Sequence, residues 1–307
     1  MIISASKRCD IPAFYSDWFI NRLKEGYAYV RNPVQTNIVY EVELTPETVD
    51  CIVFWTKNPK PMLDRLDELS GYPYYFQYTL NWYGKDMEPN VPDIKDRVET
   101  FIKLSEKIGR ERVVWRYDPI VFTDVYTPDW HRKCFATLAE ILHEHTEKAV
   151  ISLVDLYPRN TNHLVNTGYV QINYDERIAL LKDMAEIAHK YGLVIATCAE
   201  NIPEAPKYGI FQNSCIDREL VERVIGTQIY AQKSNSRSAC NCVENVDIGS
   251  YDACPHRCIY CYAKPKTDMT GIKYDPDAPM LKDKYDPEND VLKKRLMYSL
   301  KVSETPF

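Results

Sequence analysis

The chain has 307 residues, of which 45% are hydrophobic and 27% are charged, and its formal net charge is −6. That balance is ordinary for a globular protein of one or two domains, and it argues against broad, non-specific binding to nucleic acid. No apolar run reaches the ~18 residues of a membrane span, and the N-terminus MIISASKRCD lacks the features of a signal peptide. We therefore expect a cytoplasmic protein without a membrane partner.

The first two-thirds of the chain alternates strand-like and helix-like segments. Strand candidates rich in Val, Ile, Tyr and Phe occupy 1–6, 50–56, 74–80, 112–117, 149–156 and 193–200. Helical patterns occupy 16–25, 59–69, 93–108, 128–146 and 174–191, and extended segments near 27–31 and 37–43 predict a hairpin. Strands that are apolar throughout suit a parallel sheet covered by helices. The alternation predicts an α/β fold, namely a TIM-type (β/α) barrel that is complete or partial.

The pattern loosens after residue 200. A short helix is expected at 217–225, a polar stretch QKSNSRSACNC follows, and VDIGSY at 246–251 predicts a short strand. Residues 266–307 are polar and contain KYDP twice, so we expect a surface wrap with one terminal helix at 288–300. We therefore predict a barrel body over 1–200, a cysteine-rich region over 201–265 that completes it, and a C-terminal wrap over 266–307.

Ten cysteines in a chain without an export signal require an explanation other than disulfides, which are rare in the cytoplasm. Clustered cytosolic thiols usually indicate a metal. Cys254, Cys258 and Cys261 form a C-x3-C-x2-C triplet, and this spacing can ligate three irons of a [4Fe–4S] cube. A zinc site would need a fourth ligand, which Cys240 or Cys242 could supply, so zinc remains an alternative.

The triplet, with Tyr260 directly before its last cysteine, resembles the signature of the radical S-adenosylmethionine (SAM) superfamily. The resemblance implies that Cys254, Cys258 and Cys261 hold a [4Fe–4S] cluster whose open iron binds SAM, with Tyr260 near the adenine. It implies reductive cleavage of SAM to methionine and a 5′-deoxyadenosyl radical that removes hydrogen from a substrate. It also implies an electron donor such as flavodoxin or ferredoxin. The substrate stays open between nucleic acid, peptide and small molecule.

The position of the triplet departs from that superfamily, in which it follows the first barrel strand. Here six strand candidates precede it. The stretches SASKRCDIPAFY, VFWTKNP, WRYDPI, TCAE, SCID and DIGSYDACPHRCIYCYA resemble an uncharacterised bacterial domain-of-unknown-function family with the same late triplet. A circular permutation would reconcile the order, because VDIGSY would take the place of the first strand and the N-terminal strand that of the second.

Four further cysteines precede the triplet: Cys198, Cys215, Cys240 and Cys242. Four thiolates are enough for a second [4Fe–4S] cluster or for a zinc site. The alternative is that Cys198 and Cys215 are small buried residues without a ligand, since free cysteine is often buried.

Polar side chains follow the predicted strands, where the chemistry of barrels gathers. We expect Arg116, Asp118 and Lys57 to act on the substrate, and Tyr260, Arg8, Asp10, Asn58 and Glu200 to bind the cofactor. Arg116 lies in an apolar strand, where a charge is costly unless paired, and is the strongest candidate to hold a carboxylate or phosphate. An Arg116–Asp118 or Arg8–Asp10 ion pair is the structural alternative.

The leading prediction is a radical SAM enzyme with an oxygen-sensitive [4Fe–4S] cluster. Two other functions stay open. One is a metal-stabilised nucleic-acid-binding or repair-associated protein in which the cysteines are only structural, and the other is a barrel hydrolase with a structural zinc. Iron with sulfide would favour the enzyme, whereas zinc in a colourless protein would favour the other two.

Overall fold

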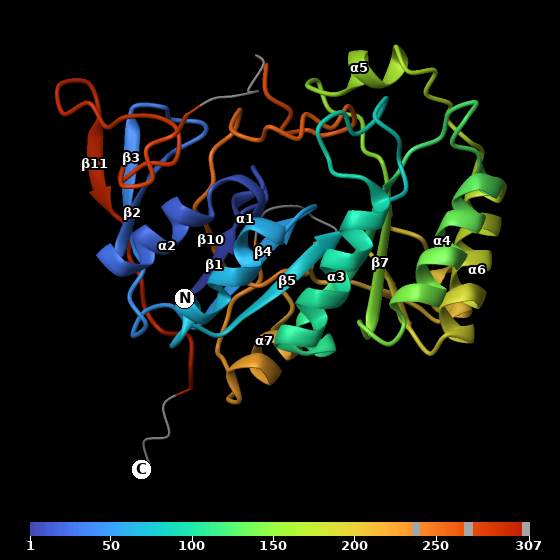
Figure 1. Cartoon of the computed structure of the whole chain (residues 1–307), viewed down its shortest axis with the longest axis horizontal. Coiled ribbons are helices and arrows are strands. Elements are labelled where there is room, and N and C mark those ends of the chain that lie inside the picture. Colours follow the sequence, from blue (N-terminus) through green and yellow to red (C-terminus); the bar gives the residue numbers. More distant parts are fainter. Residues whose placement is uncertain (235–239, 267–272, 303–307) are drawn as a thin grey trace.

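An eight-stranded parallel sheet forms the centre of the protein in a computed structural model that describes residues 1–234, 240–266 and 273–302 (Figure 1). The strand order is β10-β1-β4-β5-β6-β7-β8-β9. The strands are β1 (Ile2–Ala5), β4 (Cys51–Thr56), β5 (Tyr74–Thr79), β6 (Val113–Ile120), β7 (Lys148–Leu153), β8 (Val194–Thr197), β9 (Ile210–Gln212) and β10 (Val246–Asp247). The six strands predicted for the body and the strand in VDIGSY are confirmed, and β9 was not predicted.

The sheet is open in the part of the chain that the structure describes, with β10 and β9 as its two edges. The closed form of the predicted barrel is therefore wrong, and the fold is a mixed α/β arrangement around an open sheet. Closure requires the two edge strands to pair with each other, and here they have only two and three residues.

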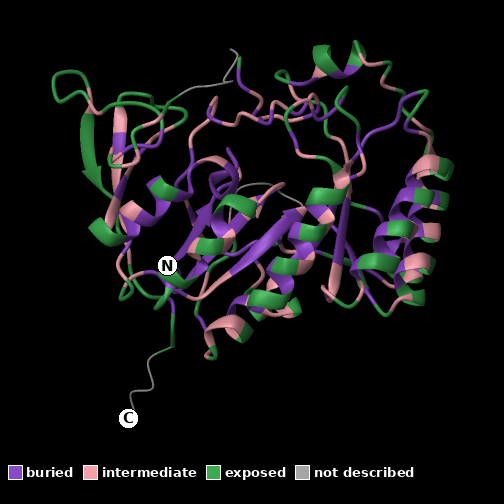
Figure 2. Ribbon diagram, viewed as in Figure 1, coloured by how far each residue is buried: buried purple, intermediate pink, exposed green. Residues whose placement is uncertain are grey.

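Alternate residues of each strand enter two different cores because successive strand side chains point to opposite faces. On one face, Ile3, Phe54 and Trp115 belong to the larger core beneath the helices. The helices of the described chain are α1 (Ile11–Phe14), α2 (Ser16–Glu25), α3 (Ile94–Ile108), α4 (Pro128–Leu142), α5 (Thr161–Val165), α6 (Tyr174–Lys190) and α7 (Arg218–Ile225). Short 3-10 helices occupy η1 (Lys60–Leu69), η2 (Arg110–Arg112) and η3 (Ala205–Tyr208). Figure 2 shows the buried sheet and the exposed outer faces of α3, α4 and α6.

The opposite face of the sheet is covered by α7 and the cysteine-rich segment. Ile2, Val53 and Tyr75 from the strands pack there with Val221 of α7. Thiols of the cysteine-rich region belong to the same core, so this region is part of the sheet domain and does not form a separate layer.

Local sequence signals explain where the longer helices begin and end. α6 begins with a capping box in which Asn173 and Glu176 bond to each other's backbone N–H groups. Thr127 caps α4 and is followed by a proline at its first position. α2 ends at Gly26, whose φ of 78° is a left-handed conformation that glycine adopts without strain.

A separate three-stranded sheet contains the predicted hairpin. β2 (Tyr27–Arg31) pairs antiparallel with β3 (Ile38–Glu43), and β11 (Val291–Lys294) pairs parallel with β3. The helix predicted at 288–300 is therefore wrong. All four side chains of β11 are exposed, so a helix there would gain no buried face, whereas a strand satisfies the backbone groups at the edge of β3.

None of the described helices combines the length and apolarity needed to cross a membrane. Residues 235–239 of the predicted cysteine-rich region, and residues 267–272 and 303–307 of the predicted wrap, lie outside the described residues.

Candidate functional site

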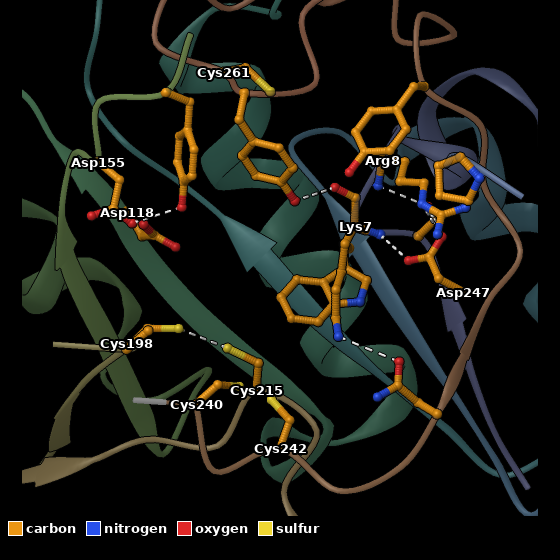
Figure 3. A pocket seen from close by; sticks show the side chains of 18 of the residues that line it. Lys7, Arg8, Asp118, Asp155, Cys198, Cys215, Cys240, Cys242, Asp247 and Cys261 are labelled. Atoms are coloured by element: carbon orange, nitrogen blue, oxygen red, sulfur yellow. Dashed lines mark hydrogen bonds and ion pairs between the residues drawn. The ribbon is translucent and has the colours of Figure 1, made fainter. Parts of the chain in front are cut away.

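A cavity of about 740 Å³ opens at the carboxyl ends of the parallel strands (Figure 3). Carboxyl ends of parallel strands meet at one edge of a sheet, so residues far apart in sequence converge there. The lining includes Lys7 and Arg8 after β1, Lys57 after β4, Arg116 and Asp118 of β6, Asp155 after β7 and Cys198 after β8. The volume lies within the roughly 300–1,000 Å³ typical of small-molecule sites.

The triplet loop, residues 252–264, follows β10 and is held against other segments of the cavity wall. β10 itself pairs with the N-terminal strand β1. Asn160 Nδ2 donates to the carbonyl of Tyr260 at 2.8 Å, and the hydroxyl of Tyr262 donates to the carbonyl of Lys7 at 2.6 Å. The loop therefore has a fixed backbone, and Cys261 lines the cavity.

Cys258 is buried, Cys254 and Cys261 are half-buried, and the three thiols lie close enough to affect the pKa of Cys254. Burial raises the pKa of Cys254 well above its usual value, and the neighbouring Cys258 and Cys261 add to that rise. The pKa values of Cys258 and Cys261 are also raised by burial, and the backbone N–H of Ala263 donates to Cys261 Sγ at 3.3 Å. Such thiols ionise only beside a cation, and hydrogen bonds to sulfur are typical of iron–sulfur sites. Three cysteine thiols are the donor type that ligates the irons of a [4Fe–4S] cluster, although no three His, Cys, Asp or Glu side chains of the described residues, the triplet included, are already arranged to hold a metal ion.

The other four cysteines gather on the side of the cavity away from Cys261 (Figure 3). Cys198 Sγ lies 3.1 Å from Cys215 Sγ. The Cys215 thiol also has a hydrogen-bond contact with the Cys242 thiol, and the Cys242 thiol has one with the Cys240 thiol. The predicted group is thus brought together. Its contacts run in series, and within residues 1–234, 240–266 and 273–302 no three His, Cys, Asp or Glu side chains are already arranged to hold a metal ion.

One protein family covers nearly all of this architecture. A family model matches residues 2–263, from β1 to two residues beyond Cys261. The chain belongs to DUF1848, a domain of unknown function. The DUF1848 match includes the whole parallel sheet, both cysteine groups and most of the cavity lining, and it excludes β11. No curated protein matches the chain.

Asp10 of this DUF1848 chain connects three segments and is not among the described residues that line the cavity. Its carboxylate accepts hydrogen bonds from the backbone N–H groups of Ala13 at 3.0 Å and Lys57 at 2.7 Å. His256 Nε2, from the triplet loop, lies 2.9 Å from Asp10 Oδ2. Asp10 is therefore placed to position the triplet loop, a contact that the sequence did not reveal because His256 is distant in the chain.

Arg8 lines the cavity. The predicted alternative of an Arg8–Asp10 pair is replaced by an ion pair in which Arg8 Nε lies 3.8 Å from Asp247 Oδ1. The guanidinium of Arg8 also lies 5.4 Å from the ring centre of Tyr251, and that of Arg159 lies 5.3 Å from the same ring. Both arginines thus place positive charge beside Tyr251, a ring that lines the cavity.

Glu88 is the main site residue that sequence reasoning missed. It is 1% exposed, and its carboxylate lies 2.8 Å from Lys57 Nζ and 3.3 Å from Arg97 Nη1, while the hydroxyl of Tyr260 also donates to it. Burial alone would raise the pKa of Glu88, but Lys57 and Arg97 lower it overall, so the carboxylate stays charged. Glu88 lies in a loop, where a charged residue is the ordinary expectation, so no pattern singles it out.

Arg116 is 4% exposed, and its guanidinium donates hydrogen bonds to other side chains of the protein. Its Nε donates to Asp118 at 3.0 Å, and its Nη1 donates to Gln77 at 3.3 Å and to Cys215 Sγ at 3.0 Å. It also lies 5.4 Å from the ring centre of Trp55. The Arg116–Asp118 ion pair is therefore formed, and it places a cation beside the second cysteine group.

Asn58 and Glu200 lie outside the set of described residues that line the cavity. Asn58 Oδ1 accepts from the backbone N–H of Lys60 at 3.4 Å, which is a local turn contact. Glu200 accepts the backbone N–H of Leu153 at 2.8 Å, and burial raises its pKa. Both side chains thus accept hydrogen bonds from backbone N–H groups near strand ends. Their contacts with a cofactor stay predictions.

Proposed function

We propose that this DUF1848 protein is a radical SAM enzyme that cleaves SAM reductively and removes a hydrogen atom from a substrate. One observation carries the proposal. The C-x3-C-x2-C loop directly follows the strand beside β1 and presents Cys261 to a cavity at the carboxyl ends of a parallel sheet. Barrel and open α/β enzymes place their chemistry at that edge.

The strand order supports a circular permutation of a partial barrel. If the strands are counted in their spatial order from β10 through β1, β4, β5, β6 and β7, the triplet follows the first strand of the sheet. This is its place in the superfamily that the sequence resembles. Neighbouring strands, and not the positions of the chain ends, determine which loops meet. The late triplet therefore reaches the edge that an early triplet would occupy.

The triplet cysteines would hold the [4Fe–4S] cluster and leave one iron without a protein ligand. When bound and reduced, the cluster supplies the electron that breaks a C–S bond of SAM. Two contacts from the rest of the chain hold the loop in place. The carboxylate of Asp10 pairs with the His256 imidazole, and the carboxylate of Glu88 accepts a hydrogen bond from the Tyr260 hydroxyl. We assign the reduction of the cluster to an electron donor such as flavodoxin or ferredoxin.

The cavity offers both signs of charge that SAM requires. Arg8 and Lys57 would supply positive charge for its carboxylate while they stay paired with Asp247 and Glu88. Asp118, the partner of Arg116, would supply negative charge for its ammonium group. Arg116 is bound by its neighbours, so we assign it a positioning role between Asp118 and Cys215. The substrate is an unassigned nucleic acid, peptide or small molecule.

Metal content after anaerobic reconstitution with iron and sulfide tests the proposal. We expect about four irons per chain in the wild type, and loss of them in the Cys254→Ala, Cys258→Ala, Cys261→Ala triple variant. Cys134→Ser, a buried cysteine on α4, is the matched control and should keep the iron. SAM should also change the electron paramagnetic resonance spectrum of the reduced wild type. Unchanged iron in the triple variant would overturn the assignment.

A further inference from the structure

The second cysteine group lines the same cavity as Cys261 but shares no cysteine with the triplet. Cys198 follows β8, Cys215 lies in the loop after β9, and Cys240 and Cys242 precede β10. The side chains of Cys215 and Cys242 are almost fully buried. Three separate segments therefore bring four thiols to one wall of the cavity (Figure 3).

Hydrogen-bond donors point at these sulfur atoms. Arg116 Nη1 donates to Cys215 Sγ at 3.0 Å, and Asn213 Nδ2 donates to the same sulfur at 3.5 Å. The backbone N–H of Ile216 donates to Cys242 Sγ at 3.3 Å. Metal-bound thiolates are supported by such donors, and one of these donors is a buried cation. A cysteine that only fills space in a core needs none of them.

The sulfur spacing favours one ion over a cluster. Thiolates around one zinc ion lie roughly 3.5–4 Å apart, given Zn–S bonds near 2.3 Å. Sulfurs on different irons of a cube lie on the order of 6–7 Å apart. The distance of 3.1 Å between Cys198 Sγ and Cys215 Sγ is close to the first spacing and far from the second. The four thiols touch in series, so binding of one ion requires side-chain rotations that bring the four sulfurs around one point.

We propose that Cys198, Cys215, Cys240 and Cys242 bind one thiophilic divalent metal ion, zinc. A donor set of four thiolates suits zinc and leaves no open position for catalysis, so the site is structural. It joins the end of β8 and the loop after β9 to the segment before β10, and it thereby fixes one wall of the cavity. None of the four belongs to the triplet, so this inference stands or falls independently of the proposed SAM chemistry.

Zinc content of the full-length protein purified in air tests the inference. We expect one zinc per chain in the wild type, in Cys134→Ser and in the triplet triple-alanine variant, as measured by mass spectrometry of the metal. The Cys215→Ser, Cys242→Ser double variant should lose the zinc, with its fold checked by circular dichroism. Zinc retained by the double variant would overturn the inference. So would iron with sulfide that disappears only in the double variant, because that result identifies a cluster.

Thiol labelling of the wild type decides the question even where the double variant does not fold. We expect an alkylating reagent to leave all four cysteines unmodified until a strong chelator removes the zinc, with peptide mass spectrometry as the readout. Adding zinc back to the chelated protein should restore the protection. A Cys198–Cys215 disulfide in place of a metal, or protection unaffected by the chelator, would overturn the inference.

Discussion

At the scale of single residues, buried charges are concentrated around the proposed cofactor loop. Glu88 connects Lys57 after β4 with Arg97 of α3 and Tyr260 of the triplet loop. Removing a charge from water costs free energy, so buried charges are tolerated only when opposite charges pair with them. The proposed site therefore also depends on Glu88 and Arg97, which are not among the residues that line the cavity.

We predict that Glu88→Gln destabilises the protein by about 3–5 kcal/mol, because it leaves the buried Arg97 and the partly buried Lys57 without their carboxylate. Urea unfolding measures the change. Glu186→Gln is the control, since its pair with Lys182 is exposed on one helix face and should change the free energy of unfolding by less than about 0.5 kcal/mol. Similar effects of the two changes would show that the Glu88 network contributes no more than a surface pair.

His131 gives a pH dependence. It is buried on α4, its Nδ1 lies 2.9 Å from the hydroxyl of Tyr117, and its Nε2 lies 2.9 Å from the carbonyl of Val121. Burial lowers the pKa of His131 from 6.5 to about 4. The unfolded chain therefore takes up a proton before the folded protein does as the pH falls. The stability contribution of neutral His131 is complete above pH 6.5 and is lost as the pH falls towards 4.

Comparison with His131→Gln isolates this contribution, because glutamine does not titrate. We predict that wild-type stability falls by about 3 kcal/mol more than that of the variant between neutral pH and the folded pKa. Urea unfolding at several pH values provides the two curves. Parallel curves over that window would mean that His131 is protonated equally in the folded and unfolded states.

At the scale of secondary-structure elements, the two-residue strand β10 positions the triplet. Asp247 at its end accepts from the hydroxyls of Ser4 at 2.9 Å and Ser6 at 2.8 Å and from the backbone N–H of Lys7 at 2.8 Å. Charge-assisted bonds of this kind are stronger than bonds between neutral groups. They compensate for the short ladder between β10 and β1, and they bring the triplet loop to the edge of the sheet.

Gly249 allows β10 to lie this close to β1. A Cβ atom at this position would lie 2.5 Å from Ser6 Cβ and 3.0 Å from Cys9 Sγ. We predict that Gly249→Ala costs about 1–3 kcal/mol of stability, as overpacking does elsewhere. The cost should shrink in a Ser6→Gly background, and a double-mutant cycle by urea unfolding measures that coupling. An equal cost in both backgrounds would contradict the close approach.

The sequence predicted regular elements well and tertiary contacts poorly. Apolar runs such as 51–56 indicate buried strands because they are short and rich in β-branched and aromatic residues. The segment 288–300 was misassigned because its charged residues carry no clear period, and an available edge of β3 decided its conformation. The rule that polar groups gather at strand ends placed Arg8, Lys57 and Arg116 in the cavity lining.

The same rule could not find Glu88 or the pairing of Asp10 with His256. These contacts join loops that are distant in the sequence, 246 residues apart in the case of Asp10 and His256. Only the three-dimensional arrangement brings such loops together. The second cysteine group was visible as a composition bias, but its series of sulfur contacts and the donor from Arg116 depend on the register of β6 with its neighbours.

At the scale of the whole molecule, the cavity lies between two cysteine groups of different proposed character. The triplet, next to the strand β10, would hold the reactive cluster, and the four-cysteine group would fix the opposite wall. The DUF1848 match covers both groups and the sheet that carries them. We therefore propose that the protein carries a redox centre on a permuted α/β scaffold.

Cleavage of SAM tests that claim most directly. Reconstituted protein is reduced with dithionite under anaerobic conditions, SAM is added, and 5′-deoxyadenosine and methionine are quantified by liquid chromatography and mass spectrometry. We predict that wild type and Cys134→Ser release the two products in equal amounts, and that the triplet triple-alanine variant releases neither. Wild-type protein with a full complement of cluster iron that forms no 5′-deoxyadenosine would contradict the account.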